Sequence, residues 1–261
     1  MSELVLLEKN NGVAVIRLNN PKTGNSLDYD MYISLRDKLK ECEDNKEIRA
    51  IVVTGEGKNF STGGDIRGFL DRIEKKTFIT QEEAEIAADT GFIIRKCKKP
   101  TIAMVNHAAA GAGCSIACAC DFRIVTPSSN FIMAFINVGL PGDTDGLYFL
   151  TRLVGVGRAS DIMMTGRAVG GEEAYQMGLA TRVVDEDALE VETMKMARKL
   201  SKMPGRALEC QKALFNNYFY GMSEKAYAQD EAKYTVECSR SADFEEAVHA
   251  FIEKRRPVFG K

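Results

Sequence analysis

The sequence predicts an α/β fold followed by a helical C-terminal segment. Runs rich in β-branched residues alternate with amphipathic runs through the first half of the chain, and turn-forming residues separate them. This alternation is typical of strands joined by helical crossovers. Beyond about residue 200, helical periodicity replaces the β-branched runs. We therefore predict a core over residues 1–200 and a helical subdomain over residues 201–261.

The predicted elements follow one another in a regular order. Strands are expected at residues 13–18, 48–54, 101–105 and 122–125. Helices are expected at residues 28–42, where Asp28 is a suitable N-cap, and at residues 113–120. Residues 67–90 are charged and are expected to form an exposed, mobile helical insert. Two further amphipathic helices are expected at residues 223–239 and 243–254.

Composition and charge argue against several functional classes. A net charge of −2 over 261 residues predicts no broad electropositive surface and no nucleic-acid partner. No apolar run approaches the roughly 20 residues that span a bilayer, and the N-terminus lacks a signal-peptide pattern, so we expect a cytoplasmic protein with no membrane partner. Cys114, Cys118 and Cys120 lie close together, but no second Cys/His pair follows at zinc spacing. We expect reduced thiols and no metal site.

Two glycine-rich segments directly follow predicted strands. They are N-F-S-T-G-G-D at residues 59–65 and N-H-A-A-A-G-A-G-C-S at residues 106–115. Small side chains allow a ligand to approach the backbone, and free amides at a helix start bind negative charge. Tight packing of a helix on the sheet is the alternative. Neither segment has the Gly-Lys-Ser/Thr of a phosphate-binding loop.

These segments resemble the signatures of the crotonase (enoyl-CoA hydratase/isomerase) family. Residues 60–65 resemble F-[SC]-[AST]-G-x-D, and residues 105–121 resemble N-G-x-A-x-G-x-G with a helix that ends in C-D. Further matches lie at residues 19–27, 153–155, 174–179, 183–184 and 255–259. The resemblance implies a crotonase-type ββα spiral core and an acyl-CoA substrate, with no cofactor beyond the CoA of that substrate. It also implies a homotrimer or homohexamer whose helical subdomain serves oligomerisation and forms part of the CoA and acyl pocket.

By position, the resemblance assigns two backbone oxyanion donors to Gly64 and Ala112. Such amides stabilise the negative charge that builds on a thioester oxygen. His107 replaces the family's usual glycine and is expected to be a hydrogen-bonded structural residue. Substrate contacts are expected at Lys22, Ser61, Thr62, Asp65, Ser115, Phe135 and Phe259, although Lys22 could equally be a solvated surface residue.

The chemistry is predicted from which acids are present. Hydratases of the family carry two glutamates, and Ser115 and Phe135 occupy their positions here. Neither side chain can serve as a general base at neutral pH, which argues against hydration. Residues 131–143 resemble F-x-M-A-F-x-x-x-G-L-x-x-D of Δ3,Δ2-enoyl-CoA and ring-1,2-epoxyphenylacetyl-CoA isomerases, which places their catalytic aspartate at Asp143. We therefore predict isomerisation of an enoyl-CoA double bond with Asp143 as acid and base, its pKa raised by burial.

Other interpretations stay open at this point. Asp143 could cap a helix over residues 144–150, or act as a covalent nucleophile as in 4-chlorobenzoyl-CoA dehalogenases. Asp145 is a weaker candidate for the base. A serine hydrolase can be assembled from Ser115, Asp143 and His249, although the glycine of a nucleophile elbow is missing. Enoyl-CoA hydration and a non-catalytic CoA-binding role are the remaining alternatives.

Overall fold

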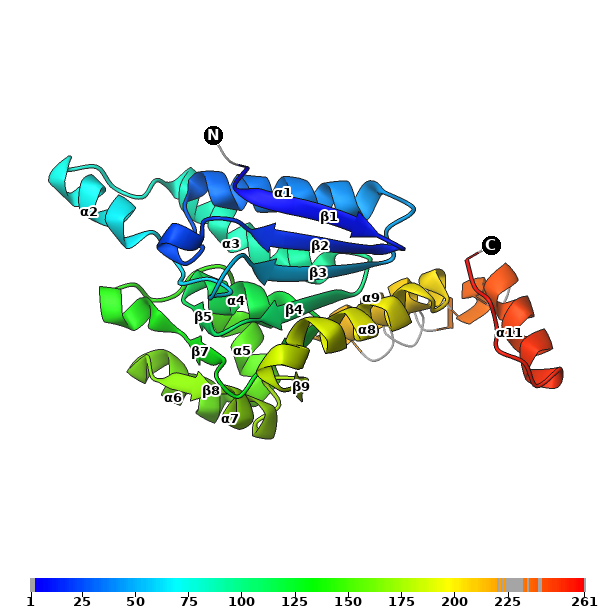
Figure 1. Cartoon of the computed structure of the whole chain (residues 1–261). Helices are drawn as coiled ribbons and strands as arrows, with labels where there is room; N and C mark the ends of the chain where they lie inside the picture. The colour runs from blue at the N-terminus through cyan, green and yellow to red at the C-terminus, as the bar shows by residue number, and fades with distance from the viewer. Residues whose placement is uncertain are drawn as a thin grey trace.

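The computed structural model describes residues 3–219, 221, 223, 232–233, 235–238 and 241–260. Its main sheet has six strands in the order β1 (Val5–Asn10), β2 (Val13–Leu18), β3 (Ala50–Gly55), β4 (Thr101–Val105), β6 (Phe122–Val125) and β9 (Arg182–Val183). β1 is antiparallel to β2, and the other neighbouring strands are parallel (Figure 1). The predicted α/β class is therefore confirmed.

The crossovers of this sheet are helices, as the sequence predicts. They are α1 (Tyr29–Asp44), α2 (Ile66–Glu74), α3 (Gln81–Lys96) and α4 (Ala112–Ala119). Asp28 is the N-cap of α1, because its side chain accepts a hydrogen bond from the amide of Met31 at 2.8 Å. The charged insert predicted at residues 67–90 is α2 together with the first part of α3.

A second, three-stranded sheet was not predicted. It consists of β5 (Ala108–Ala110), β7 (Asn130–Ile132) and β8 (Ala168–Gly170) in that order. β5 and β7 are parallel, and β8 is antiparallel to β7. Three-residue strands are too short to show a period of two in the sequence, so only their pairing reveals them.

The main sheet is covered by helices on both faces. Because side chains alternate along β2, Ala14, Ile16 and Leu18 join one cluster while Val13 and Val15 join another. The first cluster contains buried residues of α1, α3 and α4. The second contains buried residues of α8 (Leu189–Ser201). The glycine-rich turns follow strands of this doubly covered sheet.

Among the described residues from 146 onward, helices dominate. Besides α8 they are α5 (Gly146–Val154), α6 (Val156–Thr165), α7 (Gly171–Gln176), α9 (Gly205–Phe219) and α11 (Ala242–Ile252). Short 3-10 turns lie at η1 (Pro21–Thr23), η2 (Ala134–Val138) and η3 (Glu186–Ala188). The helix predicted at residues 243–254 is α11, whereas most of the one predicted at 223–239 lies outside the described residues. None of the described helices is long and apolar enough to cross a membrane.

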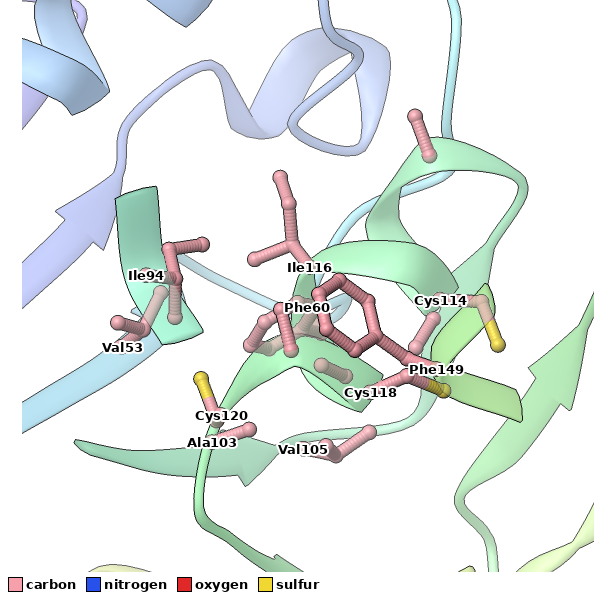
Figure 2. Close-up of a cluster of buried hydrophobic side chains, with 14 of the residues drawn as sticks. Val53, Phe60, Ile94, Ala103, Val105, Cys114, Ile116, Cys118, Cys120 and Phe149 are labelled. Atoms are coloured by element: carbon pink, nitrogen blue, oxygen red, sulfur yellow. The ribbon is translucent and has the colours of Figure 1, made fainter. Parts of the chain in front are cut away.

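The clustered cysteines pack as small apolar side chains. Cys114, Cys118 and Cys120 are buried with Phe60 and Phe149 around α4 (Figure 2). Within the described part of the chain, no group of three or more His, Cys, Asp or Glu side chains could hold a metal ion. Every residue of α4 is buried, so packing holds this helix from all sides.

The C-terminal end of α4 is capped by Arg123 of β6, which is 4% exposed. Its guanidinium donates to the carbonyl of Cys120 at 2.6 Å and also to that of Leu179. Arg123→Met leaves these acceptors unpaired, so we expect the free energy of unfolding to fall by about 2–3 kcal/mol in urea titrations. Arg182→Met, at an exposed site of the same sheet, is the control and should change it by less than about 0.5 kcal/mol. Equal stabilities of the two variants would contradict this role.

Candidate active site

The two glycine-rich turns are hydrogen-bonded to each other. The amide of Ser61 donates to the carbonyl of Ala108 at 3.0 Å, and the amide of Ala110 donates to the carbonyl of Ser61 at 2.9 Å. The turns also touch at glycines. A Cβ on Gly63 would lie 2.7 Å from the carbonyl oxygen of Ala110, and one on Gly113 would lie 2.6 Å from the Cβ of Ser61. Both positions therefore require glycine.

This contact brings two free amides to one cavity. Leu27 pairs with the backbone on both sides of Gly64, accepting from Asp65 and donating to Gly63, so the amide of Gly64 stays unused. Ala112 is the first residue of α4, so no helical carbonyl lies one turn earlier to accept a hydrogen bond from its amide. Among the described residues, neither amide donates to an acceptor, and both Gly64 and Ala112 line the same cavity. Such a pair can bind an oxygen that becomes negatively charged.

The cavity has a volume of about 940 Å³, which lies within the range of small-molecule sites. Much of its wall is apolar and comes from α1, α2, α3, η2 and the loops that flank them: Leu27, Tyr29, Ile66, Phe69, Phe78, Ile79, Ala84, Ala87, Ala134, Phe135, Val138 and Leu140. Its ionisable lining is mainly acidic: Asp28, Asp30, Asp65, Asp71, Glu83 and Asp143. Arg72 also lines it, but it pairs with Glu83.

Asp143 lies in the loop between η2 and α5 and lines the same cavity as Gly64 and Ala112. Burial raises the pKa of this carboxyl, and the amide of Thr144, which donates to Oδ1 at 2.6 Å, opposes that rise. α5 begins at Gly146 with Asp145 as its N-cap residue. The alternative in which Asp143 only caps this helix is therefore wrong. Because Asp143 lines the cavity, its carboxylate is a candidate for chemistry there.

The turn that carries Asp143 has an unusual backbone. Thr144 and Asp145 have φ values of 53° and 58°, and a left-handed conformation is costly for a β-branched threonine. The hydroxyl groups of Thr144 and Tyr32 form a hydrogen bond of 2.8 Å. Gly91 of α3 packs under the turn, where a Cβ would lie 2.8 Å from the carbonyl oxygen of Thr144. The surrounding structure thus holds a strained turn in place.

Gly91→Ala should displace this turn. A helical glycine-to-alanine change normally stabilises by up to about 1 kcal/mol, but here the added carbon meets backbone, so we expect a loss of about 1–3 kcal/mol. We also expect turnover to fall about tenfold because Asp143 moves. Gly157→Ala in α6 is the matched control, since nothing lies within 4 Å of its Cβ position. Thermal unfolding and steady-state kinetics of both variants test this. A Gly91→Ala protein as stable and active as Gly157→Ala would contradict it.

Asp145 provides a test of pH dependence. Burial, followed by the charges of Asp89 and Asp143, raises its pKa from 3.8 to about 6. A folded-state pKa above the unfolded value means that the folded protein binds the proton more tightly, so ionisation between about pH 4 and pH 6 destabilises it. Asp145→Asn removes that charge, and asparagine tolerates the left-handed conformation. We expect the Tm advantage of the variant to grow across this range and stay constant above it. A difference in Tm that does not change with pH would contradict this pH dependence. The Asp145→Asn variant should keep its catalytic activity.

Three of the predicted substrate-contact residues line the cavity. They are Thr62, Asp65 and Phe135. Asp65 is the N-cap of α2, because its carboxylate accepts from the amide of Arg67 at 3.1 Å. Phe135 is 6% exposed and lies in η2 against Gly111, where its ring forms part of the wall.

Four other predicted contact residues do not line the cavity. Lys22 is exposed on η1, and Ser61 is fully buried with its hydroxyl donating to the carbonyl of Asn25 at 2.7 Å. Ser115 is fully buried, and its hydroxyl donates to the carbonyl of Asp143 at 3.0 Å. Phe259 follows α11, which lies at the opposite end of the molecule from α2 (Figure 1). In this chain, Phe259 therefore does not reach its own cavity.

His107, the histidine whose side chain the structure describes, does not line the cavity. His107 adopts a φ of 85°, and its Nδ1 lies 2.9 Å from the carbonyl oxygen of Ser128, as expected of a hydrogen-bonded structural histidine. The side chain of His249, the third member of the hydrolase alternative, lies outside the described residues. The buried hydroxyl of Ser115 does not face the cavity, so the hydrolase arrangement receives no support.

Several cavity residues were not predicted. Phe69, Arg72, Phe78 and Ile79 come from the charged insert, whose composition is also that of an ordinary solvated surface. Tyr32 lies on the buried face of α1. A tyrosine on a buried helix face needs a hydrogen-bond partner for its hydroxyl, and this need is the sequence signal that could have marked Tyr32 for attention.

Comparisons with known proteins agree with this geometry. The family described as Enoyl-CoA hydratase/isomerase matches the chain over residues 8–261. A trans-2-decenoyl-[acyl-carrier-protein] isomerase of Streptococcus mutans is 30% identical over 98% of this chain and 97% of that protein. A 1,2-epoxyphenylacetyl-CoA isomerase of Escherichia coli is 32% identical over 99% of both. The crystal structure of an enoyl-CoA hydratase from Polaromonas sp. JS666 superimposes with a TM-score of 0.92 at 28% identity, covering 98% of this chain and 99% of that one.

Proposed function

The chain belongs to the enoyl-CoA hydratase/isomerase family of enzymes, and from this premise we propose that it isomerises the double bond of an enoyl thioester. One observation carries the proposal. Asp143 lines the same cavity as Gly64 and Ala112, whose amides donate to no acceptor among the described residues. A single acid beside an oxyanion site suits a proton transfer between two carbons of one substrate.

The proposed reaction moves one proton. The thioester oxygen accepts hydrogen bonds from Gly64 and Ala112, and the carboxylate of Asp143 removes a proton from carbon 2 of a 3-enoyl thioester. The electron pair of that C–H bond delocalises toward the oxygen as a dienolate, and the double bond shifts when carbon 4 takes the proton back from Asp143. Atoms and electrons of substrate and product balance, so the reaction needs no co-reactant.

The positions of the two hydratase glutamates argue for isomerisation over hydration. Ser115 is enclosed, because a Cβ on Gly146 would lie 2.2 Å from its hydroxyl oxygen. A larger glutamate at position 115 would meet the start of α5. Phe135 presents a phenyl ring to the cavity. Neither position offers a carboxylate to activate water.

The cavity wall favours an uncharged acyl chain. Apolar side chains supply much of the lining, and Arg72, the one arginine among the described lining residues, is paired with Glu83. A carboxylate at the far end of the acyl group would meet several acids, and no free cation lies among the described lining residues to pair with it. We therefore propose an apolar enoyl group. Its carrier is proposed to be CoA, as the family name suggests, and an acyl-carrier protein is the alternative that the name of the Streptococcus mutans relative raises.

The test incubates the purified protein in deuterated water with 3-enoyl and 2-enoyl thioesters on each carrier. We expect interconversion of the two alkenes, with deuterium at carbon 2 or carbon 4 to the extent that protonated Asp143 exchanges with solvent before it returns the proton. A 3-hydroxyacyl product would replace the proposal with hydration. Transfer of an unlabelled Asp143 oxygen to the product in a single turnover in oxygen-18 water, with the label left in Asp143, would indicate nucleophilic chemistry at Asp143. Binding without turnover of any substrate would favour a non-catalytic role.

The family resemblance also leads us to propose a homotrimer or homohexamer. Supporting this, α9 and α11 expose large apolar side chains: Phe215 and Phe244 are 66% and 50% exposed. Exposed apolar patches of this kind are typical of interaction surfaces. Analytical ultracentrifugation of the full chain distinguishes a trimer or hexamer from a monomer, and a monomer at micromolar concentration would contradict the proposal.

A further inference from the structure

We propose that Tyr32 is a positioning residue for the carboxylate of Asp143 and that it acts through Thr144. The inference rests on the proposed function, because it concerns the acid of that reaction. Tyr32 lies on α1, far from Asp143 in the sequence, and no motif of the family signatures includes it. Its side chain nevertheless lines the same cavity as Asp143.

The first step of the argument is the contact between Tyr32 and Thr144. Tyr32 is 6% exposed and Thr144 is fully buried. Their hydroxyl oxygens lie 2.8 Å apart, within hydrogen-bond distance. Burial, and then the negative charge of Asp143, raises the pKa of the Tyr32 hydroxyl. The phenol therefore stays protonated at neutral pH and serves as a hydrogen-bonding group, not as a base.

The second step leads from Thr144 to the carboxylate. The amide of Thr144 donates to Oδ1 of Asp143 at 2.6 Å, and Thr144 itself has a left-handed backbone conformation. Such a conformation persists only when its surroundings support it. Without the phenol, the buried hydroxyl of Thr144 loses its partner, which favours a rearrangement of the turn. Asp143 would then lose both its amide donor and its orientation.

The third step connects Tyr32 to the oxyanion site. α1 starts immediately after Asp28, and Leu27 is bonded to the backbone on both sides of Gly64. One continuous segment, residues 27–32, therefore contacts the oxyanion donor at one end and the turn of Asp143 at the other. The hydrogen bond between Tyr32 and Thr144 sets how the carboxylate is placed relative to that donor.

Several ionisable groups surround Asp143 and could affect its titration. Tyr32 from α1 and Asp145 from its own turn interact with it electrostatically. Among the described residues, the other ionisable groups on the cavity wall are Asp28, Tyr29, Asp30, Asp65, Asp71, Arg72 and Glu83. The variants below remove none of these wall groups, and the phenol that Tyr32→Phe removes is uncharged at neutral pH, so a change in the titration of Asp143 reports on the turn itself.

The kinetic test compares Tyr32→Phe, Thr144→Ala, Thr144→Ser and the double variant of Tyr32→Phe with Thr144→Ala. We expect Tyr32→Phe and Thr144→Ala to lower kcat about tenfold with KM changed less than about twofold. Thr144→Ser keeps the hydroxyl and should retain most of the activity. The double variant should be no worse than either single variant, because both break one hydrogen bond. Tyr175→Phe, on the exposed face of α7, is the control for loss of a phenol.

A second readout distinguishes positioning from general structural support. The amide of Thr144 lowers the pKa of Asp143, so its loss should raise that pKa and shift the acid limb of kcat/KM to higher pH. Carbon-13 NMR titration of the Asp143 carboxyl, assigned with Asp143→Asn, measures the same change without substrate. A Tyr32→Phe protein with a lower Tm but unchanged kcat, acid limb and carboxyl titration would overturn the inference.

The two proposals fail separately. If the wild-type protein isomerises no enoyl thioester, the proposed function fails, but the NMR titration still reports whether Tyr32 controls the carboxyl of Asp143. If the wild type is active and Tyr32→Phe matches it in kcat and titration, only the positioning role is lost.

Discussion

Asp143→Asn should lower kcat by about three orders of magnitude, because general acid–base catalysis contributes about 10²–10⁴-fold and the proposed reaction uses this one carboxylate. Asparagine has nearly the same shape, and its side-chain oxygen can still accept from the amide of Thr144. KM should change little. Stability at neutral pH should be retained or increased, since burial disfavours the ionised aspartate that the change removes.

Steady-state kinetics with a 3-enoyl thioester measures this loss, and circular dichroism confirms the fold. Asp30→Asn is the matched control, because Asp30 also lines the cavity but lies on the first turn of α1. Its turnover should stay within about threefold of the wild type. If Asp143→Asn retained more than about a tenth of the wild-type kcat, another base would have to carry the reaction.

Gly63→Ala should separate the two glycine-rich turns and lower kcat about a hundredfold. Gly63 has a φ of 86°, and its Cβ position lies 2.7 Å from the carbonyl oxygen of Ala110. The main chain must move to admit the methyl group, and Gly64 moves with it. A correctly aimed oxyanion donor contributes about 10²–10³-fold to kcat, so a small displacement of Gly64 should lower kcat strongly. The strained φ should also reduce stability by about 1–3 kcal/mol.

Gly155→Ala separates these two contributions. Gly155 has a φ of 81°, and nothing lies within 4 Å of its Cβ position, so this variant incurs the conformational cost without the steric contact. It should lose stability but keep kcat. The comparison uses thermal unfolding for stability and isomerisation for catalysis. Equal kcat values for the Gly63→Ala and Gly155→Ala proteins would show that the contact between the turns does not control catalysis.

Local patterns in the sequence were sufficient for the main elements. Residues 13–18, 101–105 and 122–125 are strands as predicted, and Asp28 caps α1 as predicted. These features depend on neighbouring residues: β-branched runs favour extended backbone, and a capping side chain reaches only three residues along the chain. The glycine-rich turns were recognised for the same reason, because the need for small side chains is visible at each position.

The tertiary structure alone decided which groups share the cavity. Ser115 was expected near substrate, but α4 is buried on every side and its hydroxyl bonds to a carbonyl. The helix after Asp143 starts later than predicted, because Thr144 and Asp145 adopt left-handed conformations that packing against Gly91 and Tyr32 holds in place. Those partners lie more than fifty residues away along the chain. Sequence patterns report what neighbouring residues prefer, whereas these contacts exist only after the sheet and its helices have folded together.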